Sequence, residues 1–292
     1  MAEQQWQGTT YGNTWMHQRL IRLLRYIDIR FLYVFATVFV VPVCLVVNPA
    51  RRIIYRYFRL RWHMSPLKAS YATWRNFVLF SQVVIDKFAM YAGKTFNVEI
   101  EGYHHYQRLV SQPAPFLQLS AHIGNYEVAG FTLRADKKKI NALVYLGEKE
   151  SVMENRKKLF AQTNIRMIGI REDMGHLFEI NEALSNGEAV SMPADRLFGS
   201  KKSISKLFLG AQAAFPSGPF SLATMRGLDC IAVNVMKTNS TTYKIYVTPL
   251  EYDKTLPRKE QIEQLASAYT AELERMLAMY PEQWYNYFEF WT

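Results

Sequence analysis

Cysteine is scarce in this chain of 292 residues, which contains only Cys44 and Cys230. Neither a disulfide framework nor a metal cluster can be built from two such residues, so no structural metal is expected. A globular part that faces a reducing, cytoplasmic compartment is the simplest inference. Acidic residues are also outnumbered, 25 against 35 lysines and arginines, which gives a formal net charge of +10. The surface is therefore expected to attract anionic partners such as nucleic acid, anionic lipid or an acidic protein.

The signatures of several protein classes are missing. There is no zinc-finger spacing, no RNP-like aromatic strand and no basic zipper, which argues against nucleic acid as the partner. There is no Walker-type loop and no Gly-x-Gly-x-x-Gly run, so no nucleotide cofactor is expected. The Gly-x-Ser-x-Gly nucleophile elbow is also absent, which disfavours a serine hydrolase.

Long uncharged apolar runs are limited to one segment, residues 31–47, which reads FLYVFATVFVVPVCLVV. Its 17 residues are at the low end of the length that spans a bilayer, and it begins too late for a signal peptide. We expect Pro42 to kink its helix, which membrane helices tolerate. A membrane anchor that spans or re-enters the bilayer is favoured, and a buried or interfacial helix is the alternative.

Basic residues flank this run on both sides, opposed by Asp28 alone. Their position favours contact with lipid headgroups but does not define an orientation in the membrane. The flanking residues are Arg19, Arg22, Arg25, Arg30, Arg51, Arg52, Arg56, Arg59 and Arg61. We therefore assign residues 1–62 to a basic and apolar membrane-anchor region and residues 63–292 to a separate α/β domain.

The rest of the chain alternates between strand-like and helix-like segments. A long helix is expected at residues 64–92, packed against the main domain. We expect further helices at residues 125–134, 151–162, 174–185, 217–226 and 257–280. Strands are expected at residues 95–100, 116–120, 141–145, 167–170, 189–192, 205–209, 230–236 and 243–247. This alternation predicts an α/β fold with a mixed, largely parallel sheet flanked by helices.

The most informative stretch is residues 116–130, FLQLSAHIGNYEVAG. An apolar strand leads to His122, Gly124 and Asn125 turn the chain, and Glu127 lies in the first turn of the next helix. Reactive groups collect at the carboxyl ends of strands in α/β sheets. The turn can bring Glu127 within hydrogen-bonding reach of the imidazole, so we predict that His122 and Glu127 are the catalytic pair. The alternative is that both residues are structural.

This pair fits the chemistry of acyl transfer to a hydroxyl. An imidazole with a pKa near neutrality can take the hydroxyl proton as attack develops, which is worth roughly 10²–10⁴-fold in rate. A carboxylate on the other nitrogen fixes the tautomer and stabilises the imidazolium. No covalent acyl-enzyme is then required.

Four blocks in register resemble one family. Residues 122–127 (HIGNYE) resemble the His-x4-Asp/Glu motif of glycerolipid acyltransferases, in particular the branch that contains the late acyltransferases of lipid A biosynthesis. Residues 191–196 (SMPADR) resemble the family's apolar strand that ends in Pro-Asp. Residues 209–223 resemble its Phe-Gly and Gly-Pro/Ala-x-x-Leu-Ala segment, and residues 280–284 (YPEQW) resemble its terminal block. The resemblance covers residues 20–290.

The resemblance implies further site residues. Asp195 is expected at a strand end facing the same cleft, where it orients a loop or the acceptor headgroup; a cap or salt bridge is the alternative. An arginine is expected to hold an acceptor phosphate or the developing oxyanion. The candidates are Arg166 and Arg171, with Arg196 as a third, and each could equally be a surface cation. Asn125 and Gly218 complete the candidate substrate-binding residues.

The C-terminal block is expected to close the fold, with Trp284 in the core and Gln283 bonded to backbone groups. The aromatic tail beyond it could rest on the membrane surface. Its residues are Tyr285, Tyr287, Phe288, Phe290 and Trp291.

The resemblance also implies the activity. The expected enzyme is an O-acyltransferase of the bacterial inner membrane, with its catalytic domain on the cytoplasmic side and no cofactor. The expected donor is acyl-carrier protein, with acyl-CoA as an alternative, and the acceptor is a lipid A precursor or related glycolipid. An aminolipid or lysophospholipid acceptor is the alternative, and a non-catalytic membrane-surface protein is a reading from another class. Candidate contacts for the acidic carrier are 137–139, 157–158 and 201–202, all lysines.

Overall fold

The computed structural model describes residues 14–133, 135, 137–146, 150–160, 163–171, 173–197 and 202–291. Seven strands form one sheet in the order β1-β9-β8-β2-β5-β3-β4. Neighbouring strands run parallel except for the antiparallel pair β8–β9. The prediction of a mixed, largely parallel sheet is therefore confirmed. The strands are β1 (Asn97–Glu101), β2 (Phe116–Ser120), β3 (Ile140–Tyr145), β4 (Ile165–Ile170), β5 (Ala189–Pro193), β8 (Asp229–Lys237) and β9 (Thr242–Pro249).

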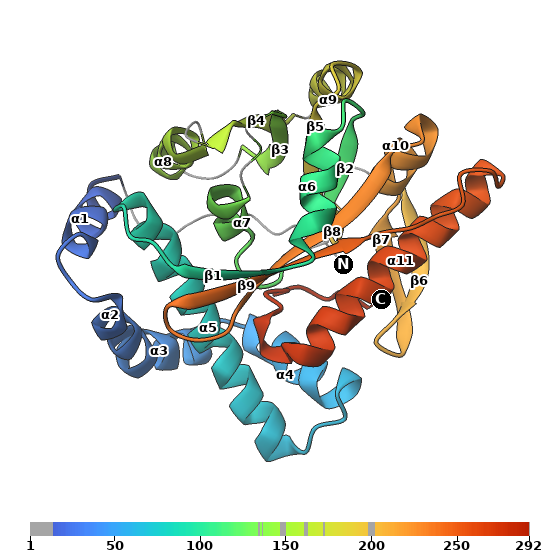
Figure 1. Cartoon of the computed structure of the whole chain (residues 1–292). Coiled ribbons are helices and arrows are strands. Elements are labelled where there is room, and N and C mark those ends of the chain that lie inside the picture. Colours follow the sequence, from blue (N-terminus) through green and yellow to red (C-terminus); the bar gives the residue numbers. More distant parts are fainter. Residues whose placement is uncertain are drawn as a thin grey trace.

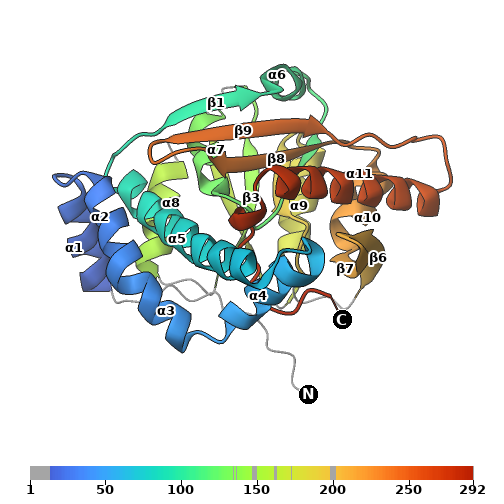
Figure 2. The same cartoon turned by 90° about the horizontal axis from the view of Figure 1, so that it is seen from below.

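The helices fall into two groups along the chain. Figures 1 and 2 show α1–α5 gathered at one end of the molecule and α10 and α11 toward the other. The first group is α1 (Thr14–Leu24), α2 (Ile29–Phe35), α3 (Val41–Val47), α4 (Ala50–Arg61) and α5 (Pro66–Tyr91). The later helices are α6 (Tyr103–Ser111), α7 (Tyr126–Thr132), α8 (Glu150–Phe160), α9 (His176–Ser185), α10 (Gly218–Arg226) and α11 (Arg258–Met279).

A separate antiparallel hairpin joins β6 (Ser203–Phe208) to β7 (Ala211–Pro216). Its two-residue turn, Leu209–Gly210, has positive φ at both positions, the backbone geometry that tight hairpins favour. The sequence predicted a strand at 205–209 but none at 211–216. A leucine at a left-handed position hides the turn signal, because Asn, Asp or Gly is the usual residue there.

The apolar N-terminal segment is helical from Ile29 to Val47. Among the described residues it is the one segment that is both long enough and apolar enough to cross a membrane. A π-helical stretch, Ala36–Val40, lies between α2 and α3. It directly precedes the first turn of α3, which contains Pro42. Since proline cannot donate to the helical ladder, the expected irregularity takes the form of a π-turn.

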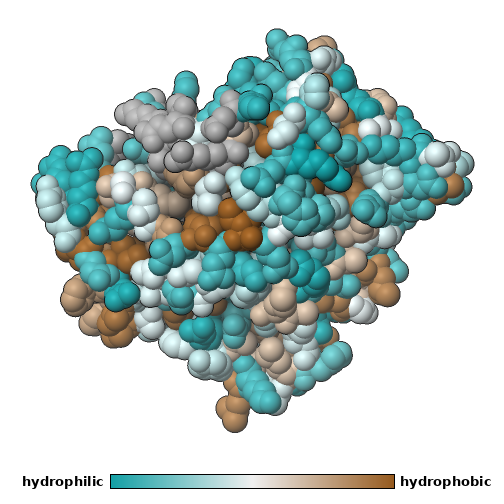
Figure 3. Space-filling model, in the orientation of Figure 1, coloured by the Kyte–Doolittle hydropathy of each residue, from teal (hydrophilic) through white to brown (hydrophobic). Residues whose placement is uncertain are grey.

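This segment has two different faces. One face packs against α5 and buries Ile29, Tyr33, Ala36 and Val41. Figure 3 shows hydrophobic surface over this N-terminal region of the molecule. The large apolar side chains that remain exposed are Phe31, Val34, Phe35, Val38, Phe39, Val40, Val43, Val46 and Val47. The helix therefore packs on α5 with one face and, within the described part of the chain, leaves its other apolar face exposed.

The aromatic tail differs from its expected position on a membrane surface. Tyr285 and Phe290 are buried, and Trp291 donates a hydrogen bond to the Phe208 carbonyl. Trp291 also stacks on Phe208 with ring centroids 5.9 Å apart. The tail packs into the core because the β6–β7 hairpin and α4 present aromatic partners to it.

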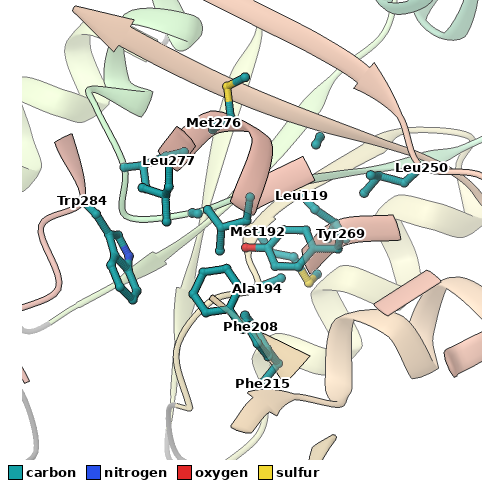
Figure 4. Packing of buried hydrophobic residues seen from close by; sticks show 14 of the residues in the cluster. Leu119, Met192, Ala194, Phe208, Phe215, Leu250, Tyr269, Met276, Leu277 and Trp284 are labelled. Carbon is teal, nitrogen blue, oxygen red and sulfur yellow. The ribbon is translucent and has the colours of Figure 1, made fainter. Parts of the chain in front are cut away.

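The main hydrophobic core lies beneath the ends of the central strands. Figure 4 shows Leu119 of β2 and Met192 of β5 beside Tyr269 of α11. All three side chains are buried, and the Tyr269 hydroxyl donates to the Ser120 carbonyl at 2.9 Å. This packing fixes the carboxyl ends of β2 and β5. The candidate site residues His122 and Asp195 follow these strand ends.

Candidate active site

The carboxyl ends of two adjacent parallel strands bring the first site residues together. In the register of β2 and β5, Leu119 is opposite Met192 and Ser120 is opposite Pro193. The Ala194 N–H continues this pairing by donating to the Ser120 carbonyl. His122 and Asp195 each follow two residues after their strand, so they meet at the same edge of the sheet.

His122 and Asp195 are joined by two hydrogen bonds. The imidazole Nδ1 lies 2.8 Å from Asp195 Oδ1, and the backbone N–H of His122 donates to Oδ2 at 2.9 Å. The Asp195 side chain is only 1% exposed, whereas that of His122 is 22% exposed. A carboxylate on Nδ1 favours the tautomer whose Nε2 is unprotonated and can accept a proton. One aspartate thus orients both the ring and the loop that carries it, as expected for a loop-orienting Asp195.

Glu127 has different partners from those that its spacing predicts. Its Oε1 accepts from Arg156 Nη2 at 2.6 Å and from Lys87 Nζ at 3.1 Å, and Oε2 accepts from the Tyr91 hydroxyl at 3.2 Å. The expectation that Glu127 holds the imidazole is corrected: Asp195 occupies that position. Glu127 lies in the first turn of α7, and its side chain is bound by residues of α5 and α8. The five-residue spacing between His122 and Glu127 does not specify the direction in which the Glu127 side chain projects from α7.

Burial and neighbouring charges shift the pKa values of His122 and Glu127. Burial lowers the pKa of His122, and the negative charge of Asp195 opposes that effect only in part. The imidazole is therefore neutral at pH 7. Burial alone would raise the pKa of Glu127, but Arg156 and Lys87 outweigh it and lower the pKa to about 2. Glu127 is therefore an ionised carboxylate between cations at neutral pH.

Replacing Glu127 with glutamine is expected to lower the free energy of unfolding by roughly 3–5 kcal/mol at pH 7, because two largely buried cations lose their carboxylate. The folded-state pKa of about 2 lies below the ordinary value of 4.5. The stabilisation by Glu127 is thus present above pH 4.5 and is lost as the pH falls toward 2. Denaturant unfolding across this range should show the wild type and Glu127→Gln converging. The exposed Glu99→Gln is the control, and parallel curves for wild type and Glu127→Gln would contradict the assignment.

The turn between His122 and α7 is bound on two sides. Gly124 has φ +54°, and a Cβ there would lie 1.8 Å from the Val235 carbonyl, so only glycine permits this approach. The Asn125 N–H donates to the same carbonyl, at the end of β8. On the other side, Gly124 N–H donates to the Gln283 carbonyl, and Tyr285 N–H donates to the His122 carbonyl.

The C-terminal block has the predicted role. The Gln283 side chain accepts from the Lys237 N–H at 2.9 Å and donates to the Lys237 carbonyl at 2.7 Å. Trp284 is 1% exposed and pairs in an isolated bridge with Ile123. Backbone satisfaction by Gln283 and core packing by Trp284 are therefore confirmed, and both residues contact the turn that follows His122.

The two arginines first considered for the site lie elsewhere. Arg166 and Arg171 both form ion pairs with Glu179 of α9, at 2.8 and 2.5 Å. Arg166 belongs to β4 and Arg171 follows it, and β5 and β3 separate β4 from β2. At about 4.8 Å between strands, both residues are remote from the imidazole.

Arg156 is a buried arginine that contacts the motif directly, through Glu127. Sequence reasoning missed it, although Val152, Arg156 and Phe160 share one face of α8 at spacings of four and are all buried. Lys87 was missed for a similar reason. It interrupts the apolar stretch of α5, which is the only signal that the sequence offers.

The remaining candidates have structural partners. Arg196 donates to the Tyr285 carbonyl at 2.8 Å, and its guanidinium lies 5.5 Å from the centroid of the Phe288 ring. Gly218 begins α10, and nothing lies within 4 Å of a Cβ built there, so no close approach requires glycine. Lys138 is buried and donates to three carbonyls, those of Pro113, Ala114 and Gly187.

Among the lysines predicted to contact an acidic carrier, four have exposed side chains: Lys137, Lys139, Lys157 and Lys202. Lys139 also pairs with Glu188 at 3.3 Å. Lys201 and the side chain of Lys158 lie outside the described residues. Among the residues that the structure covers, no group of three or more His, Cys, Asp or Glu is arranged to hold a metal ion.

Comparison with known proteins gives a family match and a likeness to solved structures. Residues 78–291, more than half of the chain, match the sequence model described as bacterial lipid A biosynthesis acyltransferase. The crystal structure of the 1-acyl-sn-glycerophosphate acyltransferase PlsC from Thermotoga maritima is similar, with a TM-score of 0.41 and 16% identity over 90% of this chain and 98% of that chain. Comparison with curated protein sequences gives no match.

Proposed function

The chain belongs to the bacterial lipid A biosynthesis acyltransferase family, and from this premise we propose that it transfers a fatty acyl chain from acyl-carrier protein to a hydroxyl of a lipid A precursor. Family membership makes it an acyltransferase that acts on a lipid. The observation that carries the proposed mechanism is the hydrogen-bonded pair of His122 and Asp195 at the ends of β2 and β5.

In the proposed reaction, the acceptor hydroxyl oxygen attacks the carbonyl carbon of the thioester while Nε2 of His122 takes the hydroxyl proton. The tetrahedral intermediate then expels the carrier thiolate, which takes that proton from the imidazolium. Asp195 stabilises the imidazolium between these steps. The lowered pKa of His122 supports this role, since the base is neutral before the reaction begins. No bond forms between the acyl group and the protein.

Glu127 and Arg156 are proposed to act as one unit beside this pair. The buried ion pair between them supports Arg156, in place of Arg166 or Arg171, as the arginine near the acceptor phosphate or developing oxyanion. In this role Glu127 orients Arg156 and limits where its charge can be placed. Arg196, which follows Asp195 in the chain, is proposed to support the same edge of the site.

Membrane attachment is proposed to use the exposed apolar face of the Ile29–Val47 helix. Its opposite face is packed on α5 of the catalytic domain, so the helix would bring the bilayer close to that domain. The exposed residues Arg30 and Arg52 flank this face and favour anionic headgroups. We place the catalytic domain on the cytoplasmic side of the inner membrane, where an acidic acyl-carrier protein would meet the exposed lysines.

The test is an acyl-transfer assay with purified enzyme in mixed micelles. Carrier-bound and CoA-bound fatty acid are each offered with a lipid A precursor, a lyso-aminolipid or a lysophospholipid, and products are identified by mass spectrometry. We expect a mass gain of one acyl chain on the lipid A precursor with the carrier-bound donor. Gain only on another acceptor would favour the alternative acceptors. Release of free fatty acid without transfer to any acceptor would contradict the proposal.

A further inference from the structure

A buried ion pair connects through Tyr243 to the turn that carries His122, and the mechanism above does not use it. Asp86 of α5 and Lys237, the last residue of β8, have their charged groups 2.5 Å apart, with side chains 0% and 2% exposed. Burying two charges costs several kcal/mol per ion before their attraction is counted, so such a pair is poor evidence of stabilisation by itself. The pair is therefore of interest for the side chains that it holds in position.

Two tyrosine hydroxyls converge on the same carboxylate. Tyr243 of β9 donates to Asp86 Oδ2, the oxygen that also accepts from Lys237, and Tyr33 of α2 donates to Oδ1. The cluster therefore joins α2, α5, β8 and β9 through one aspartate. All four side chains are buried.

Tyr243 connects this cluster to the catalytic turn. The Asn125 Nδ2 group donates to the Tyr243 hydroxyl at 3.2 Å. A carboxylate in an ion pair only accepts, so Tyr243 must give its single proton to Asp86 and present its oxygen lone pairs to Asn125. The negative charge of Asp86 thus fixes the direction of these hydrogen bonds, which run from Asn125 to Tyr243 to Asp86. The Asn125 amide therefore has one favoured orientation, with its NH₂ group toward Tyr243. Asn125 lies three residues after His122 in the same turn.

Two neighbouring residues of α5 act on the segment that opens α7, one through Tyr243 and one by direct contact. Asp86 acts through Tyr243 on Asn125, and Lys87 pairs directly with Glu127. The Asn125 backbone N–H donates to the Val235 carbonyl on β8, whereas its side chain donates to Tyr243 on β9. The side-chain bond to Tyr243 is thus a second, independent restraint on the turn that carries the base.

We propose that Tyr243 is a positioning residue for acyl transfer: held by Asp86 and Lys237, it orients Asn125 and with it the turn that carries His122. The inference rests on the proposed function, in which His122 must present Nε2 to the acceptor hydroxyl. A base that moves by a fraction of an ångström loses rate without losing substrate affinity.

The test compares Tyr243→Phe with Tyr106→Phe in the full-length enzyme. Tyr106 is a matched control, since it is buried in the same hydrophobic cluster and loses one hydroxyl bond, to the Leu133 carbonyl. Tyr243→Phe should lower kcat on the order of tenfold with KM within about twofold, whereas Tyr106→Phe should change neither. Equal kcat values for the two variants would overturn the proposal.

Two further measurements separate positioning from general damage. Asn125→Ala should lower kcat similarly, and its combination with Tyr243→Phe should add little further loss, because both remove the same contact. The imidazole NMR signals of His122, assigned by their absence in His122→Ala, should shift in Tyr243→Phe and not in Tyr106→Phe. This readout needs no turnover. An unshifted signal overturns the proposal, while absent acyl transfer by the wild type would instead reject the proposed function.

Discussion

Replacing His122 with alanine is expected to lower kcat by roughly 10²–10⁴-fold while the protein remains folded. The imidazole supplies the only proton acceptor that the proposed mechanism uses. Its backbone contacts do not depend on the ring: the N–H still donates to Asp195 and the carbonyl still accepts from Tyr285. The turn should therefore keep its path in the variant, and the loss should fall on the chemical step.

The measurement is the rate of acyl transfer at saturating donor and acceptor, with His104→Ala as control. His104 is exposed on α6, and its replacement should leave kcat unchanged. A His122→Ala enzyme that retains transfer within a few-fold of the wild type would exclude this residue as the base. In a complementation assay, full restoration of the wild-type lipid profile by the His122→Ala variant in cells that lack the protein would support the non-catalytic alternative.

The acidic side of the pH profile reports the same group. Burial lowers the pKa of His122 from its ordinary value of 6.5, so the neutral, active form persists to lower pH than for an exposed histidine. The rate should therefore decline only below that value. A decline centred above pH 6.5 would indicate a different titrating group.

The central sheet was predictable because its strands are short apolar runs between recognisable helices. In the FLQLS run of β2 the three apolar residues are buried and the two polar ones are half-buried, which agrees with the apolar pattern of its sequence. The hairpin strand β7 was not predictable in the same way. Its turn places Leu209 at positive φ, and alanine and glutamine in AQAAFP carry little strand preference.

The N-terminal and C-terminal segments show what composition leaves open. An apolar run predicts a helix and a nonpolar environment, and it does not distinguish lipid from protein on each face. The Tyr33 hydroxyl, bound to Asp86, marks the protein-facing side of this helix. The aromatic tail posed the same ambiguity, and its burial follows from aromatic partners on α4 and the hairpin, which are distant in sequence.

In the site, the position of His122 was predictable from the sequence, and its hydrogen-bonding partner was not. His122 follows an apolar strand and precedes a glycine turn, which are local signals. Asp195 becomes its partner only because β2 and β5 are neighbours in register, 73 residues apart in sequence. The direction of the Glu127 side chain likewise depends on the positions of α5 and α8, which cannot be predicted from the local sequence.

Replacing Asp195 with asparagine is expected to lower kcat on the order of 10²–10⁴-fold, with little change in KM. The wild-type carboxylate accepts two hydrogen bonds, one from the ring Nδ1–H and one from the His122 backbone N–H. Asparagine has one carbonyl oxygen for these two donors. If that oxygen keeps the backbone bond, the amide NH₂ faces Nδ1 and favours the tautomer with its proton on Nε2, which cannot act as a base. If the amide turns over, the backbone bond is lost instead.

The pH profile separates this explanation from simple misfolding. Asp195 raises the pKa of His122 against the effect of burial, so its neutralisation should move the acidic limb to lower pH while the plateau rate falls. Asp229→Asn, an exposed aspartate at the start of β8, is the matched control and should alter neither. Because His122 and Asp195 act as one unit, the double variant His122→Ala/Asp195→Asn should be about as slow as His122→Ala alone. Fully additive losses would mean that Asp195 contributes to catalysis by a route that does not pass through the imidazole.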